Sequence, residues 1–138
     1  MDLIYGVILV VLIKLLAAVP LKQDLYAKAR FHNGSVIVGK REEGDRLLHC
    51  DLTLVELKAN KQVGISKEFP LGEPFYGYIT EVEILNLKEE DAGEVIALQG
   101  GWHENYVRFS LRSQKGVGLD YVFLVYGIDS SLNAVNNY

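Results

Sequence analysis

The sequence has little cysteine, no excess of positive charge and no helical periodicity after its first 30 residues. Cys50 is the only cysteine among 138 residues, so neither an intramolecular disulfide nor a multi-cysteine zinc site can form. Acidic residues outnumber basic ones by 18 to 14, which gives a formal net charge of -4. Nucleic-acid-binding domains usually carry a basic face, so we expect no direct contact with nucleic acid.

Recognisable catalytic and cofactor-binding patterns are also missing. The three histidines show no spacing that would present several metal ligands on one face: His32, His49 and His103. His49 precedes Cys50, but adjacent strand residues point to opposite faces, which separates this pair as a base and a nucleophile. Glu81 and Glu83 fit a solvated strand face better than an acid–base pair. We therefore expect no enzyme activity, no cofactor and no bound metal.

An apolar N-terminus is the clearest feature that the sequence does have. Leu3–Leu16 is almost wholly apolar, and Ala17 and Ala18 follow it. This length fits the apolar core of a secretory signal and is short for an untilted membrane span. A buried helix and an uncleaved anchor remain alternatives, because Asp2 replaces the usual positive charge and Lys14 interrupts the run. We predict a signal peptide over residues 1–18, secretion to the extracellular space, and no membrane contact after cleavage.

The later part of the chain is patterned as β-strands. Val107, Phe109 and Leu111 alternate with polar residues, and Tyr121–Tyr126 is apolar on both faces, as in a central strand. Ser113–Gly118 lies between these strands and contains two glycines, which suit a tight turn. The pattern predicts that the two strands pair as a hairpin, against which the rest of the chain packs.

Further strands are predicted upstream of this hairpin. Asp45–Lys58 has a period of two, which favours one long strand with Cys50 on its inner face. The residues predicted to share that inner face are Leu48, Cys50, Leu52 and Leu54. The other predicted strands are Val36–Gly39, Phe75–Leu87 and Glu94–Leu98, with a short one around Val63–Ser66 inside an irregular Asn60–Pro74.

Short strands joined by glycine-containing turns predict an all-β fold: a single small antiparallel β-sandwich, or a partly open barrel. We divide the chain into a signal peptide (1–18), an N-terminal linker (19–30), the β domain (31–128) and a flexible C-terminal tail (129–138). Asn33 opens an Asn-Gly-Ser sequon and is a glycosylation candidate in a secreted chain. A turn without a glycan is the alternative.

Several short motifs follow one another along the chain in the order Gly-Asp-Arg-Leu, Gly-Gly, Ser-Gln-Lys-Gly-Val-Gly and Tyr-Gly. Taken as a series, they resemble the multiprotein bridging factor 2 family, small proteins found chiefly in insects. The resemblance covers roughly residues 33–127. The matching positions are Gly44, Asp45, Arg46, Leu47, Gly100, Gly101, Ser113, Gln114, Gly116, Gly118, Tyr126 and Gly127.

The resemblance implies a protein without catalytic residues, whose matching glycines serve turn geometry. Asp45 and Arg46 are interpreted as a solvated turn, with pairing to a partner's charges as the alternative. Members commonly begin with a secretory signal, and some occur in saliva or venom. The family name, however, comes from a transcriptional co-activator that bridges a DNA-binding regulator and the general transcription machinery.

We therefore expect a secreted, non-enzymatic protein that acts by binding a protein partner, for example as a venom or saliva component. An intracellular co-activator is the alternative, and a carrier of an apolar ligand inside a small barrel is a third idea. The partner and the oligomeric state stay open.

Overall fold

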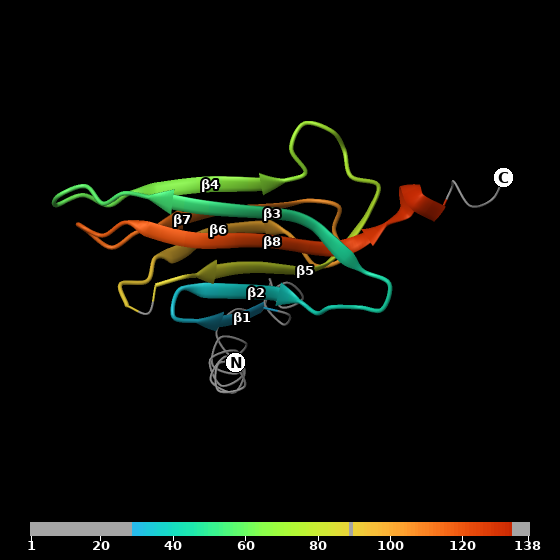
Figure 1. Cartoon of the computed structure of the whole chain (residues 1–138), viewed down its shortest axis with the longest axis horizontal. Coiled ribbons are helices and arrows are strands. Elements are labelled where there is room, and N and C mark those ends of the chain that lie inside the picture. The colour runs from blue at the N-terminus through green and yellow to red at the C-terminus, as the bar shows by residue number, and fades with distance from the viewer. Residues whose placement is uncertain (1–28, 89, 134–138) are drawn as a thin grey trace.

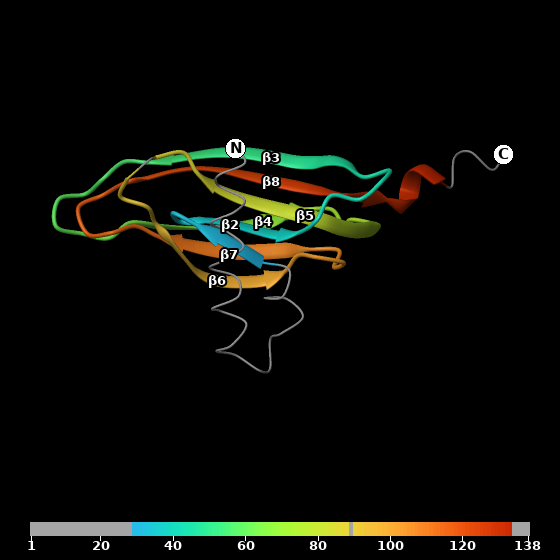
Figure 2. The same ribbon diagram turned by 90° about the horizontal axis from the view of Figure 1, so that it is seen from below.

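Two antiparallel β-sheets make up the residues that the computed structural model describes, which are 29–88 and 90–133. The larger sheet has the strand order β1-β2-β5-β8-β3, and the smaller one has the order β4-β7-β6. Figure 1 looks onto the larger sheet, with β7 and β6 behind it, and Figure 2 shows β3 and β8 on one side and β7 and β6 on the other. The all-β sandwich predicted from the sequence is confirmed.

The strands are β1 (Ala29–His32), β2 (Ser35–Gly39), β3 (Arg46–Val55), β4 (Gly64–Phe69), β5 (Gly77–Asn86), β6 (Glu94–Gly100), β7 (Val107–Arg112) and β8 (Leu119–Asp129). A short 3-10 segment, η1 (Ser130–Asn133), follows β8 and is the only helical element of the described residues. Within those same ranges, no helix is long and apolar enough to cross a membrane.

The core lies between the two sheets and is built by alternate residues of the strands. On β7, Val107, Phe109 and Leu111 are buried, as the alternation predicts. They pack against the inner residues of β8, where Phe123 meets Phe109 edge to face with ring centroids 4.8 Å apart. Burying side chains of this size contributes about 1.5–3 kcal/mol each, so the facing sheets hold each other in place.

β7 and β8 do not pair with each other, although the sequence predicts a hairpin. β7 lies between β4 and β6, and β8 lies between β5 and β3. Ser113–Gly118 therefore carries the chain from one sheet to the other. Paired side by side, the two strands would share one layer, whereas stacking lets each bury its apolar face against the other.

The inner face of β3 differs from the prediction because of a β-bulge between Leu47 and His49. Leu48 packs against the core as expected, but His49 also turns inward, and every later residue changes face. Cys50 is exposed, and Leu52 and Leu54 are 73% and 74% exposed. The inward orientation predicted for these three residues is wrong.

Three smaller differences concern the ends of elements. β4 runs from Gly64 to Phe69 and is thus longer than the strand predicted around Val63–Ser66. β1 begins at Ala29, inside the predicted linker, and β8 with η1 continues to Asn133, inside the predicted tail.

Glu81 lies on the outer face of β5 beside Glu83 but is only 5% exposed, so its predicted solvation is wrong. The signal predicted for residues 1–18 lies outside the described residues.

Candidate protein-interaction site

The first motif places Asp45 at the centre of a polar cluster. Gly44 has a φ of 83° and closes the turn that precedes β3. The Asp45 carboxylate accepts hydrogen bonds from Arg41 Nη2 (2.6 Å), from the Glu42 backbone N–H (2.8 Å) and from Thr80 Oγ1 (2.8 Å). The Asp45 side chain is 3% exposed, so the predicted solvated turn is wrong: this carboxylate fastens the turn to β5.

The charge of this cluster is satisfied within the fold. Hydrogen bonds from Arg41, from the Glu42 backbone and from Thr80 lower the pKa of Asp45 to about 2, with the Arg41 contribution the largest. The Arg41 guanidinium also lies 3.8 Å from the centre of the Tyr126 ring, a cation–π contact. Burial, and next the nearby Glu83 carboxylate, raises the pKa of Tyr126. The motif residues Asp45 and Tyr126 thus share one arginine.

A second polar chain links this turn to the connection between β6 and β7. Glu42 contacts His103 Nε2 at 2.9 Å and accepts a hydrogen bond from the Tyr78 hydroxyl at 3.3 Å. Gly100 and Gly101 have φ values of 70° and 106°, and the Gly101 N–H donates to the Tyr106 carbonyl at 2.8 Å. The Gly-Gly motif therefore forms a left-handed turn next to the Asp45 cluster.

The third motif joins three connections at the opposite end of the sandwich. Ser113 is 2% exposed, and its hydroxyl accepts the Val63 N–H and donates to the Gln114 carbonyl, both at 2.8 Å. The Gln114 side-chain amide donates to the Ala92 carbonyl at 3.2 Å, and the Gly116 N–H donates to the Lys61 carbonyl at 2.9 Å. These residues satisfy backbone groups that the sheets leave unpaired.

Two motif glycines have different reasons for lacking a side chain, which predicts different costs of substitution. Gly118→Ala would press its Cβ against the Val55 carbonyl oxygen, so we expect a loss of about 3 kcal/mol from the free energy of unfolding. Gly44→Ala meets nothing closer than 3.8 Å and strains only the left-handed backbone, at about 1 kcal/mol. Urea unfolding of both variants checks this, and equal losses would contradict it.

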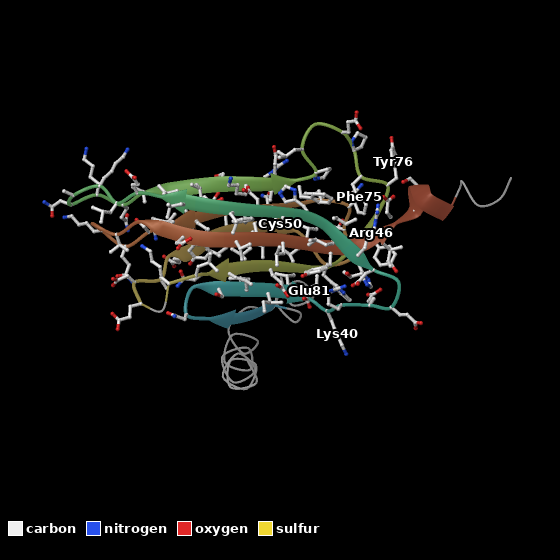
Figure 3. All side chains as sticks on the ribbon, viewed as in Figure 1. Lys40, Arg46, Cys50, Phe75, Tyr76 and Glu81 are labelled. Carbon is white, nitrogen blue, oxygen red and sulfur yellow. The ribbon has the colours of Figure 1, made fainter. Side chains whose placement is uncertain are left out.

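Arg46 and Leu47, the last residues of the first motif, line a shallow hollow of about 300 Å³. Its other lining residues are Leu48, Phe69, Pro70, Glu73, Pro74, Phe75 and Asp129. Arg46 pairs with Asp129 at 2.7 Å, and Figure 3 shows Arg46 at this end of the molecule with Phe75 and Tyr76. Hydrogen bonds from Ser131, and next the Arg46 side chain, lower the pKa of Asp129. The hollow is at the lower size limit of small-molecule sites.

The other candidate residues of the sequence do not come together. Asn33 is exposed in the turn between β1 and β2, with a φ of 45°, a position that a glycan can reach. His49 packs between Phe69 and Phe123, whereas Cys50 is exposed, so the two point apart as predicted. Across the described ranges, no group of three or more His, Cys, Asp or Glu residues could hold a metal ion.

The exposed leucines of β3 are a feature that the sequence pattern misses. Leu52 and Leu54 stand on the outer face of the larger sheet, next to Val122 and Leu124 of β8, which are half-buried. The successive apolar residues Leu47 and Leu48 are the only sign of the bulge in the sequence, since they interrupt the alternation. The geometry thus leaves an apolar surface on the outer face of β3 and its neighbour β8.

In a comparison with protein families, the chain matches the family described as Transcription activator MBF2 over residues 38–127. The matched range contains every motif position named above, from Gly44 to Gly127. No curated protein and no solved structure matches the chain. Because the family match covers more than half of the 138 residues, the chain belongs to the MBF2 family.

Proposed function

We propose that this chain is a non-enzymatic domain that binds a protein partner. The observation that carries the proposal is the pair Leu52 and Leu54, 73% and 74% exposed on the outer face of β3, the edge strand of the larger sheet. Contiguous apolar surface of this kind marks interaction sites in soluble proteins. The side chains of the motif residues Asp45 and Ser113 form hydrogen bonds inside the fold, which supports a structural role for them and not a catalytic one.

We also propose that the chain acts outside the cell, in the manner of a venom or saliva protein. The apolar run Leu3–Leu16, followed by Ala17 and Ala18, supports entry into the secretory pathway. The exposed turn at Asn33 fits a glycan added there. A second candidate, an intracellular co-activator that bridges two proteins of transcription, is favoured by the family description Transcription activator MBF2.

Expression of the full-length chain in insect cells separates these two candidates. We expect the protein in the medium to begin near Val19 and to carry extra mass that a glycosidase removes. The measurements are the intact mass and the N-terminal sequence, taken from the medium and from the lysate. Asn33→Gln is the matched control, which should be secreted without the extra mass. A nuclear chain that still begins at Met1 would make the co-activator the leading candidate.

A further inference from the structure

The outer face of the larger sheet carries a continuous apolar surface. The register places Leu52 of β3 opposite Val122 of β8, Cys50 opposite Leu124, and Leu85 of β5 opposite Val122 from the other side. Opposed residues on one face of a sheet lie within contact of each other. We call these six residues the leucine face: Cys50, Leu52, Leu54, Leu85, Val122 and Leu124. It faces the viewer in Figure 3, where Cys50 is labelled on β3.

The leucines of β3 face outward, and polar side chains of the same strand face inward. Behind Leu52 and Leu54, the inner side of β3 carries His49, Asp51 and Thr53. Among the described residues, His49 Nε2 and Thr53 Oγ1 are buried without a hydrogen-bond partner. A strand without the bulge would bury the leucines instead. This reversed arrangement makes sense for a face that a partner covers.

The carboxylates beside the leucine face favour a basic partner, because the arginine that lies on the same face, Arg41 over Tyr126, is already paired with Asp45. Asp120 stands opposite Leu54 and Glu83 opposite Leu124, both on the outer face, and Glu56 is exposed just after β3. Lys58 and Lys61 lie farther along, in the turn beyond that strand. Two copies placed face to face would bring these carboxylates together, which opposes self-association. A basic partner would meet opposite charge instead.

The shape of the site selects the conformation of the partner. An extended peptide joins a sheet at its edge, whereas a sheet face is covered by a helix or by another sheet. β3 is the edge strand of the larger sheet, and its bulge between Leu47 and His49 discourages pairing with a further strand at that end. We propose that the leucine face binds an amphipathic α-helix of a protein partner, with an apolar stripe flanked by lysine or arginine; this rests on the proposed protein-binding function.

Two synthetic helical peptides, each about 18 residues long, test this proposal. One carries a leucine stripe flanked by lysines, and the other has glutamate at each lysine position. Fluorescence anisotropy should show binding of the lysine peptide, weakened by added salt, and no binding of the glutamate peptide. Cys50 is the chain's only cysteine, so a bound helix should also slow its reaction with Ellman's reagent several-fold. Equal binding of both peptides would overturn the proposal.

Variants locate the binding on the surface. Leu52→Ser combined with Leu54→Ser should weaken binding of the lysine peptide by about tenfold or more and remove the protection of Cys50. Leu71→Ser, at a leucine that is 66% exposed in the loop after β4, is the matched control and should leave binding unchanged. Circular dichroism checks that the variants fold. An equal loss in the control would refute the site.

Two further outcomes separate this proposal from the function on which it rests. A dimer in analytical ultracentrifugation that the double serine variant dissociates would assign the leucine face to a second copy, and would overturn the basic helix. Photo-crosslinking of the protein in its own compartment tests the function itself. Crosslinks to a partner protein that avoid the leucine face would sink the surface and keep the function. The absence of any protein crosslink would sink both.

Discussion

Phe123→Ala is expected to lower the free energy of unfolding by about 3–5 kcal/mol, the range found for large aromatic residues in cores. Phe123 is 2% exposed and packs on Phe109 from the facing sheet, so truncation removes contacts on both layers and leaves a cavity. Leu54→Ala should change the stability by less than about 0.5 kcal/mol, because that side chain is 74% exposed. The two substitutions therefore measure which face of β3 and β8 is inside.

Urea unfolding at neutral pH, followed by circular dichroism, gives both values. Phe109→Ala serves as the matched variant for Phe123→Ala, since it removes the other half of the same ring pair. A loss of 2 kcal/mol or more in Leu54→Ala would show that β3 is registered without its bulge, with the leucines in the core; the range for such a buried leucine is about 2–5 kcal/mol. In that case, the leucine face would not exist.

The strands themselves could be predicted because alternation is a local signal. Val107, Phe109 and Leu111 are buried at every second position, and nothing in β7 interrupts that period. β3 shows the limit of the same reasoning. Its sequence keeps a period of two from Leu48 to Leu54, but the bulge at Leu48 exchanges the faces of all the residues that follow. A bulge depends on the pairing with β8, which the sequence of β3 alone does not contain.

The pairing of strands was harder to predict than their positions. β7 and β8 are neighbours in the sequence and have a glycine-containing connection, which favours a hairpin. However, β7 pairs with β4 and β6, and β4 is distant in the sequence. Ser66 and Ser110, which contact each other across β4 and β7, are 44 residues apart. Local propensity contains no term for such distant partners. Local propensity therefore predicts the strands but not the sheet to which each strand belongs.

The candidate site also has features that the sequence predicts and features that it does not. The family resemblance identifies the positions of the motifs, and the left-handed φ values of Gly44, Gly100 and Gly116 agree with their interpretation as turn glycines. The burial of Asp45 could not be foreseen, because its partner Thr80 lies 35 residues further along the chain. The leucine face escaped prediction for a different reason. An alternating apolar row looks the same whether it faces a core or a partner.

Asp45→Asn is expected to lower the free energy of unfolding at neutral pH by about 1.5–3 kcal/mol, the range for hydrogen bonds that involve a charged group. The amide can still accept from Thr80, but it loses the ion pair with Arg41, whose Nη2 lies 2.6 Å from the carboxylate. The side chain is 3% exposed, so water replaces little of that interaction. The turn before β3 should loosen as a result.

The acid limb of the stability curve gives this prediction its sharper form. The pKa of Asp45 falls from 3.8 to about 2 on folding, so the unfolded chain takes up the proton first as the pH falls. The stabilisation from the carboxylate is therefore complete above about pH 4 and is lost between about pH 4 and pH 2.

Urea midpoints measured across pH 2–7 should decline less in Asp45→Asn than in the wild type. Glu56→Gln, at an exposed carboxylate, should keep the wild-type decline. If Asp45→Asn also kept it, other carboxylates would cause the acid sensitivity, and the aspartate of the family motif would be left without its role in fastening the turn to β5.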